Sequence, residues 1–198
     1  MSQFVLGSGS AGRRMILENA GLDFEVRRPQ VDEEALKARF GKEGDAPVED
    51  LALALARAKA EAVSRAEERP VLGADQILVC EDRVFSKPVD MEEARRNLDF
   101  LRGRTHRLIS ALAVAEGGET VWTCVEEARM TMRNFSDAFL DRYLDMAGEN
   151  VLKSVGCYQI EGPGIQLFEK VDGDWFTIIG LPILPFLDWL RGRGLLPV

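Results

Sequence analysis

The stretch Val71-Leu72-Gly73-Ala74-Asp75-Gln76-Ile77-Leu78-Val79 is apolar except for one carboxylate and one amide near its centre. Apolar runs of about four to eight residues are typical of buried strands. A carboxylate inside such a strand is costly unless it is paired, hydrogen-bonded or bound to a metal ion. Asp75 is therefore either a satisfied structural acid or the chemical centre of a cleft, because buried acids often cluster at functional sites.

The segments on both sides of this strand predict a mixed α/β domain. Before it, the alanine-rich stretch 48–66 predicts a helix, which starts at Asp45-Ala46-Pro47 with proline in the first turn. After it, 79–85 predicts a hairpin that delivers the chain to Ser86-Lys87-Pro88. Further helices are expected at 15–20, 91–101, 137–146 and 183–191, and further strands at 4–6, 24–28, 107–115, 120–133, 165–169 and 175–179.

Two of the expected turns depend on glycine. Glu116-Gly117-Gly118-Glu119 predicts a tight turn between the two longest strands, and Asp172-Gly173 predicts a hairpin that pairs 165–169 with 175–179. The sequence contains no linker, internal repeat or low-complexity segment. We therefore expect one domain over residues 1–198.

Length and composition set further limits on the protein. No apolar run approaches the roughly 20 residues of a membrane span, and the first residues lack the basic flank of a signal peptide. We therefore expect a cytoplasmic protein that does not enter a membrane. The three cysteines, Cys80, Cys124 and Cys157, show neither metal spacing nor a disulfide framework. His106 is the single histidine, and the sequence favours a strand-entry role for it.

The formal net charge of −8 does not favour nucleic acid as a partner. An anionic substrate would need a local group of cations. Gly7-Ser8-Gly9-Ser10 offers one candidate, because a glycine and serine loop between a strand and a helix presents backbone N–H groups to an anion. Arg13 and Arg14 add forked donors suited to phosphate. The alternative is a flexible turn followed by two solvated arginines.

Three further charged residues have both a structural and a functional interpretation. Glu33 lies in the acidic stretch 31–34, which is either the first turn of a helix or the source of a carboxylate for a metal ion. Lys59 is the single lysine of the alanine-rich helix, where lysines are usually solvated. Lys87 precedes a proline, which restricts its backbone to extended forms.

Together these residues suit a divalent cation and a polyphosphate. Carboxylates bind hard metal ions such as Mg²⁺ (or Mn²⁺), which usually keep water and substrate oxygens as ligands. Metal ions and cationic side chains neutralise the charge that develops on phosphates. A carboxylate can also orient or deprotonate an attacking water.

Six segments taken together resemble the Maf family of nucleotide pyrophosphatases, once called septum formation inhibitors. The resemblance covers nearly the whole chain, and the segments occur in the family's order. It implies a fold like that of inosine triphosphate pyrophosphatase, with a long, mixed, partly bent sheet and helices around a central cleft. The matching segments are Leu6–Ser10 with Arg13-Arg14, Val31–Glu33, Leu55–Ala60, Gly73–Gln76, Ser86–Pro88 and Gly180–Pro182.

The resemblance also implies hydrolysis of a nucleoside triphosphate to the monophosphate and pyrophosphate. In family terms Asp75 is the proton acceptor, Ser8 and Arg13 hold phosphate, and Lys59 and Lys87 hold the triphosphate. Glu33 helps to place the metal ion. A homodimer is common for folds of this kind. A nucleotide-binding regulator of cell division that does not hydrolyse nucleotide is the alternative.

Substrate specificity is implied by two positions. One branch of the family hydrolyses dTTP and UTP and carries Thr after the central Asp and Gln in the later glycine loop. Another branch prefers 7-methyl-GTP and carries Gln and Glu there, and Gln76 and Glu161 resemble this second branch. A carboxylate can accept hydrogen bonds from the N1–H and amino group of guanine. The chain departs from the family at Gly12, where the 7-methyl-GTP branch can carry a stacking tryptophan, and at Ala11, where the family usually has Pro.

Overall fold

A computed structural model describes residues 2–42 and 47–197, and it confirms the α/β class. The strands are β1 Phe4–Gly7, β2 Phe24–Val26, β3 Val71–Cys80, β4 Arg83–Phe85, β5 Thr105–Glu116, β6 Glu119–Met132 and β7 Phe168–Asp172. The α-helices are α1 Ala11–Asn19, α2 Glu33–Lys42, α3 Val48–Ser64, α4 Met91–Leu101, α5 Asp137–Ala147, α6 Trp175–Ile179 and α7 Ile183–Gly192. Two 3₁₀ helices, η1 Gly148–Lys153 and η2 Pro163–Leu167, follow α5. Residues 45 and 46 of the expected start of α3 lie outside the described residues.

The described strands form one mixed sheet, as expected. Six strands follow the order β2-β1-β3-β5-β6-β7, and β4 pairs with β3. Strand β1 is parallel to β2 and β3, whereas β4 is antiparallel to β3 and β7 is antiparallel to β6. Parallel neighbours need crossover connections, and these are supplied by α1 between β1 and β2 and by α2 and α3 between β2 and β3.

The described residues fall into two compact units. Unit 1 comprises residues 2–42, 47–76, 110–126 and 175–197, and unit 2 comprises residues 77–109 and 127–174. Strands β3, β5 and β6 contribute residues to both units.

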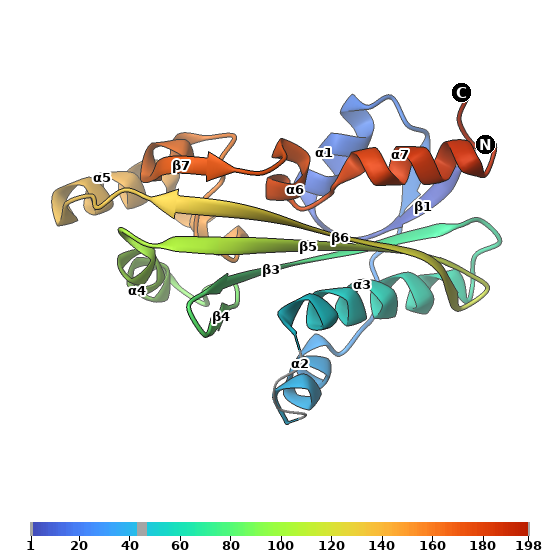
Figure 1. The fold of residues 1–198 in the computed structure, drawn as a ribbon, viewed down its shortest axis with the longest axis horizontal. Helices are drawn as coiled ribbons and strands as arrows, with labels where there is room; N and C mark the ends of the chain where they lie inside the picture. Colours follow the sequence, from blue (N-terminus) through green and yellow to red (C-terminus); the bar gives the residue numbers. More distant parts are fainter. Residues whose placement is uncertain (1, 43–46, 198) are drawn as a thin grey trace. The chain divides into compact units, whose positions relative to one another are not determined.

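In unit 1, helices cover both faces of the sheet. Helices α1, α6 and α7 lie on one face, and α2 and α3 lie on the other (Figure 1). The core on the first face contains Phe4, Leu6 and Leu72 from the strands and Phe186 from α7, all fully buried. The register pairs Leu6 with Leu72 and Gly7 with Gly73, so Ser8, which follows β1, comes next to the centre of β3.

Gly73 allows α3 to pack unusually close to β3. A Cβ atom on Gly73 would lie 2.3 Å from the carbonyl oxygen of Ala56 and 2.6 Å from the backbone nitrogen of Ala60. Ala52, Ala56 and Ala60 are fully buried and occur at four-residue spacing, so they form one face of the helix. Small residues on both elements therefore bring the backbone of α3 against the strand that carries Asp75.

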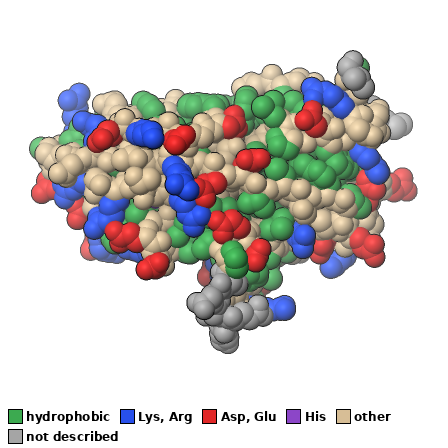
Figure 2. Space-filling view, viewed as in Figure 1, with side chains coloured by type: hydrophobic (Ala, Val, Ile, Leu, Met, Phe, Trp, Pro, Cys, Tyr) green, Lys and Arg blue, Asp and Glu red, His purple; other side chains and the backbone are tan. Residues whose placement is uncertain are grey.

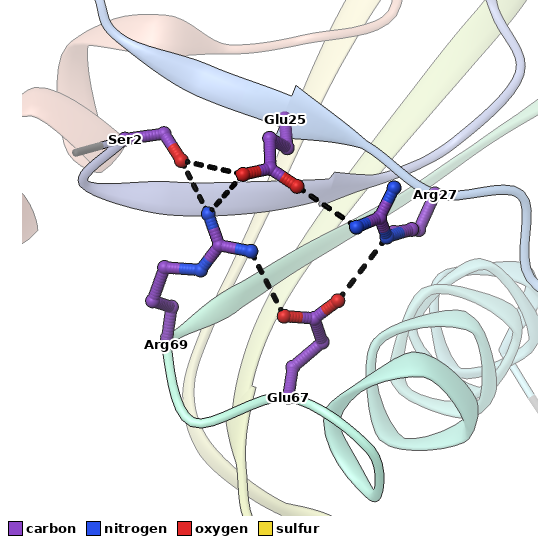
Figure 3. Close-up of polar contacts among 5 residues, drawn as sticks. All are labelled: Ser2, Glu25, Arg27, Glu67 and Arg69. Carbon is purple, nitrogen blue, oxygen red and sulfur yellow. Dashed lines mark hydrogen bonds and ion pairs between the residues drawn. The ribbon is translucent and has the colours of Figure 1, made fainter.

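A closed ring of ion pairs attaches the short strand β2 to the connection between α3 and β3 (Figure 3). Arg69 contacts Glu25 at 2.7 Å and Glu67 at 3.0 Å, and Arg27 contacts the same two carboxylates at 2.9 and 3.2 Å. Ser2 donates a hydrogen bond to Glu25 at 3.2 Å. The hydrogen bonds from Arg69 are the main cause that lowers the pKa of both carboxyl groups.

Unit 2 is built on α4 and α5, which pack against each other and against η1. Its single histidine, His106, is fully buried and lies 2.7 Å from the Tyr158 hydroxyl through Nε2. Burial lowers the pKa of His106 to about 3, so the ring is neutral. A capping box begins α4, because Asp90 accepts from the Glu93 N–H and the Glu93 side chain accepts from the Val89 N–H.

The prediction of a hairpin at Asp172-Gly173 was wrong. Residues 168–172 form β7, which pairs with β6, residues 163–167 form η2, and residues 175–179 form helix α6. Gly173 has φ +140°, and a Cβ atom there would lie 2.6 Å from the Ala128 Cβ atom. The glycine therefore permits a close approach to β6 rather than a two-residue turn.

Strand β2 is also shorter than expected, ending at Val26. Among the described residues, the helices are too short or too polar to cross a membrane.

Candidate functional site

The carboxylates of Asp75 and Glu33 meet at one ammonium group in unit 1. Lys59 Nζ lies 2.6 Å from Asp75 Oδ1 and 2.9 Å from Glu33 Oε1. The Lys59 and Asp75 side chains are 9% and 12% exposed, whereas the Glu33 side chain is 41% exposed. The cluster is thus open to solvent on the Glu33 side. Asp75 is buried and paired without being sealed away from water.

Each member of this cluster comes from a different element. Asp75 lies at the centre of β3, Lys59 in the fourth turn of α3, and Glu33 at the first position of α2. Lys59 directly precedes Ala60, whose backbone touches Gly73, so the close helix–strand approach places the ammonium beside Asp75. The expectation that a helical lysine is solvated was wrong for Lys59, because this face of α3 packs on the sheet. The first-turn position of Glu33 is confirmed.

Arg13 binds backbone oxygens on two neighbouring segments. Its Nε donates to the Gly180 carbonyl at 2.9 Å, and its Nη1 donates to the Ala74 carbonyl at 2.8 Å and to Ser8 Oγ at 3.1 Å. Burial lowers the pKa of the Arg13 guanidinium, and the charges of Asp75 and Glu33 act in the opposite direction. Arginine nevertheless stays protonated in proteins. The guanidinium therefore provides a fixed positive charge next to the cluster of Asp75, Lys59 and Glu33.

The serines of the first loop hold its shape. Ser8 Oγ accepts from the Ser10 N–H at 3.3 Å, and Ser10 Oγ accepts from the Arg13 N–H at 3.4 Å as the N-cap of α1. Such a cap satisfies one of the N–H groups left without a partner at a helix start. Arg14 lies on the exposed side of α1, where it pairs with Glu18 at 2.6 Å. The structure thus brings Ser8, Ser10 and Arg13 together and places Arg14 in an ordinary surface pair.

Residues 3–193 match the family described as Maf-like protein. The chain belongs to this family. A protein of Caulobacter vibrioides named nucleoside triphosphate pyrophosphatase is 48% identical over 198 residues, covering 100% of this chain and 99% of its own length. A protein of Mesorhizobium japonicum named 7-methyl-GTP pyrophosphatase is 52% identical over 195 residues, covering 97% of this chain and 96% of its own length.

A comparison of folds also found a solved structure, a nucleoside-triphosphatase (dITP/XTP pyrophosphatase) from Mycobacterium abscessus. It is 15% identical, with a TM-score of 0.42 over 98% of this chain and 97% of that one.

Gln76, which is predicted to be a specificity position of this Maf-family chain, binds the end of α6. Its Nε2 donates toward the carbonyl oxygens of Thr177 and Ile178 and to Ser110 Oγ, each at 3.0 Å. Ser110 Oγ in turn donates to the Thr177 carbonyl at 2.8 Å. The amide N–H₂ group is therefore engaged with the protein. This role could not be read from the sequence, because helix α6 was expected to be a strand.

Gly12, another predicted specificity position, faces the same helix. A Cβ atom on Gly12 would lie 3.0 Å from Cγ2 of Ile179. Any side chain at this position of the Maf-family chain therefore requires Ile179 to move. Packing against Ile179 therefore favours glycine over a bulky residue at position 12.

The remaining two predicted site residues belong to unit 2. Lys87 is exposed just after β4, and Glu161 is exposed in the turn before η2. A small hollow in the same unit is lined by Tyr143, Asn150, Gln159 and Pro163, together with Met146, Ala147, Val151 and Gly164. Asp75 lies in unit 1, so the meeting of Lys87 and Glu161 with Asp75 stays a prediction.

Two carboxylates of this Maf-family chain fit a hard divalent cation. Mg²⁺ is usually bound by one or two carboxylates together with substrate phosphates and water. Asp75 and Glu33 supply two such groups around one point, which the structure marks with the Lys59 ammonium. Within the described residues there is no group of three or more His, Cys, Asp or Glu side chains that could hold a metal without further ligands. These two carboxylates therefore suit a metal ion whose remaining ligands are water and the oxygens of a phosphorylated substrate.

Proposed function

We propose that this Maf-family protein hydrolyses a nucleoside triphosphate to the monophosphate and pyrophosphate at the cluster of Asp75, Lys59 and Glu33. The contact of one buried ammonium group with two carboxylates, one of which is open to solvent, carries the proposal. The names of relatives at 48% and 52% identity, which are pyrophosphatases, support it.

Asp75 is the proton acceptor in this proposal. Lys59 contacts Oδ1 of Asp75 at 2.6 Å, and we assign Oδ2 to the attacking water. The water oxygen forms a bond to the α-phosphorus, its proton passes to Asp75, and the bond from that phosphorus to the oxygen bridging it to the β-phosphorus breaks. Pyrophosphate leaves with the electron pair. Arg13 and Ser8 bind phosphate oxygens beside this position, and Lys59 and Lys87 hold the triphosphate.

Asp75 and Glu33 would hold the divalent cation, Mg²⁺ or Mn²⁺. Such an ion, when bound, neutralises charge on the phosphate oxygens and the leaving group. The chain's own residues do the rest: Asp75 receives the proton, and Arg13 keeps its positive charge fixed through its bonds to Gly180 and Ala74.

We further propose that the substrate is 7-methyl-GTP or another modified nucleotide. Glu161 would accept the N1–H and amino hydrogens of guanine and attract a cationic methylated base. The N–H₂ group of Gln76 is engaged with α6, so we assign its carbonyl oxygen to contact with the substrate. The relatives named 7-methyl-GTP pyrophosphatase support the choice of 7-methyl-GTP as the substrate. The dTTP and UTP activity of the other branch, and a regulator that does not hydrolyse nucleotide, are the alternatives.

A panel of nucleotides tests the proposal. The purified protein is incubated with Mg²⁺ and 7-methyl-GTP, GTP, dTTP, UTP or other modified triphosphates, and pyrophosphate release is measured. We expect 7-methyl-GTP to have the highest kcat/KM. Binding of nucleotide in a calorimetric titration without any turnover would replace the proposal by the regulator.

Asp75→Asn tests the assignment of the base. The amide cannot accept the proton, and we expect kcat to fall by about 10²- to 10⁴-fold, the usual contribution of a general base. Asp188→Asn is the matched control, because Asp188 makes an exposed pair with Arg191 on α7 and the same change there should leave kcat unchanged. Near wild-type turnover by Asp75→Asn would remove Asp75 from this role.

We propose that residues 1–198 act as one domain in the cytoplasm, where buried free thiols such as Cys80 and Cys157 stay reduced. A small-molecule nucleotide, rather than nucleic acid, is the partner we assign, and a homodimer is the proposed assembly.

A further inference from the structure

We infer that Lys59 is a built-in competitor of the divalent cation, and that triphosphate removes this competition by drawing Lys59 away from the two carboxylates. The inference deepens the proposed function and rests on it for the identity of the site. It assigns to Lys59 a regulatory role in metal binding in addition to contact with substrate.

The geometry places the ammonium where a cation would bind. Nζ of Lys59 lies 2.6 Å from Asp75 Oδ1 and 2.9 Å from Glu33 Oε1, within the range of charge-assisted hydrogen bonds. With Oδ2 of Asp75 assigned to the attacking water, a metal ion that binds both carboxylates needs Oδ1 of Asp75 and an oxygen of Glu33, beside the same ammonium. Two positive charges cannot share these oxygens without strong repulsion, which is only partly screened at a site as buried as that of Lys59 and Asp75.

Lys59 forms ion pairs with Asp75 and Glu33. The nearby cation Arg13 is fixed on the carbonyl oxygens of Gly180 and Ala74 and on Ser8 Oγ. A lysine side chain, in contrast, ends in a compact charge on a flexible stem. Of the two cations, Lys59 is therefore the one that can move from the carboxylates to a phosphate oxygen when triphosphate arrives.

Metal ion and triphosphate should therefore bind with positive coupling. Without triphosphate, the metal ion must displace Lys59 from its ion pairs with no new partner for the ammonium. With triphosphate, the ammonium gains a phosphate partner and vacates the carboxylates. By linkage, each ligand then raises the affinity for the other. The site would thus bind little free metal ion and would assemble fully only around its substrate.

Lys59→Met tests the inference without turnover. It keeps the length and volume of the apolar stem and removes the charge, whereas the matched variant Lys59→Arg keeps the charge. Binding of Mn²⁺ alone is measured by electron paramagnetic resonance in the absence of nucleotide. We expect the dissociation constant of Lys59→Met to be at least about tenfold lower than that of the wild type, which corresponds to about 1.4 kcal/mol. Lys59→Arg should not gain affinity.

A second measurement titrates the wild-type protein and uses a variant only to assign a signal. Lysine is labelled with ¹³C, and the Cε signal of Lys59 is assigned by its absence from Lys59→Arg. Titration with Mg²⁺ should shift this signal in parallel with metal binding. Binding of Mg²⁺ that leaves the Lys59 signal in place would overturn the inference, as would folded Lys59→Met protein with unchanged or weaker Mn²⁺ affinity.

The outcomes separate this inference from the proposed function. If Lys59→Met binds Mn²⁺ more tightly but the wild-type protein releases pyrophosphate from no nucleotide, the competition stands and the enzymatic assignment is removed. Pyrophosphate release with no gain of Mn²⁺ affinity would keep the enzyme and remove the competition.

Discussion

At the scale of single residues, the cost of burying Lys59 explains its partners. Taking an ammonium out of water is expensive, and a buried ion pair offsets this cost only when its geometry is good and its other hydrogen bonds are made. Lys59 is 7% exposed and has two carboxylates within 3 Å. The guanidinium of Arg13 adds a second positive charge beside the same two anions, so the cluster as a whole is balanced in charge.

His106 provides a prediction about pH. Burial lowers its pKa to about 3 from an ordinary value of 6.5. Between these values the unfolded chain binds a proton that the folded chain does not, so stability rises with pH in this range and is lost as the pH falls below about 6.5. We expect this group to contribute a slope of up to about 1.4 kcal/mol per pH unit.

Urea unfolding of wild type and His106→Phe between pH 7.5 and 4 measures this contribution. The variant should lose less of its stability as the pH falls, because phenylalanine does not titrate. Equal pH dependence in the two proteins would show that His106 is protonated as easily in the folded chain as in the unfolded one.

The candidate site was predictable in part, for reasons that differ between residues. Asp75 is visible in the sequence because a carboxylate interrupts an apolar strand. Lys59 has a weaker signal: it adjoins the alanines Ala56 and Ala60 at the spacing of one helix face, which indicates a close approach to another element. The bonds from Arg13 and Gln76 to Gly180, Thr177 and Ile178 were not predictable, because they depend on where α6 packs.

At the scale of elements, the approach of α3 to β3 makes Gly73 a sensitive position. We expect Gly73→Ala to destabilise the protein by about 1–3 kcal/mol or more, the range for an overpacked core, because its Cβ atom would lie 2.3 Å from the Ala56 carbonyl oxygen. Moving α3 outward also moves Lys59 from Asp75, so kcat should fall as well. Urea unfolding and pyrophosphate release measure both effects.

The control for Gly73→Ala is Gly192→Ala. A Cβ atom on Gly192, at the end of α7, has no neighbour within 4 Å, and alanine in a helix is favoured over glycine. This variant should be neutral or slightly more stable. If Gly73→Ala were equally harmless, α3 and β3 could not be packed as closely as the structure has them.

The ion-pair ring gives the short strand β2 an attachment that depends on pH. The folded pKa values of Glu25 and Glu67 are lowered, chiefly by hydrogen bonds from Arg69. The unfolded chain therefore binds protons on these groups more readily as the pH falls, so the ring's contribution is present above the ordinary glutamate pKa of about 4.3 and is lost below it.

Arg69→Gln should reduce the loss of stability between pH 5 and pH 3, since it returns the pKa values of Glu25 and Glu67 toward that of an ordinary glutamate. Arg96→Gln, which removes an exposed pair with Glu92, serves as the control and should change this dependence little. An identical acid dependence in Arg69→Gln and wild type would mean that the ring is open in solution.

The elements themselves could be predicted where local chemistry decides them. The turn at Gly117 and Gly118, with φ of +58° and +91°, follows from glycine alone. Segment 175–179 shows the limit of such reasoning, because a short apolar run between glycines fits a strand or a helix equally well. Its helical form depends on neighbours that the sequence places far away, among them Gln76 and Ser110.

At the scale of the whole molecule, the net charge of −8 must be reconciled with an anionic substrate. On the face drawn in Figure 2, basic and acidic side chains are interspersed. Many arginines are neutralised by neighbours, as Arg95 is by Asp141 and Arg191 by Asp188. Attraction of a triphosphate must therefore come from a few local cations such as Arg13 and from the metal ion rather than from the overall field.

The two compact units form one domain if they unfold together. Strands β3, β5 and β6 run from one unit into the other, so unfolding of either unit would break strands that the other uses. We therefore expect a single cooperative transition, as is usual for domains of this size. The chain offers a separate probe for each unit: Trp122, Trp175 and Trp189 lie in unit 1, and Tyr143 and Tyr158 lie in unit 2. Urea unfolding followed by tryptophan fluorescence and by tyrosine absorbance should give one midpoint, whereas two separated midpoints would make the chain two domains joined by long strands.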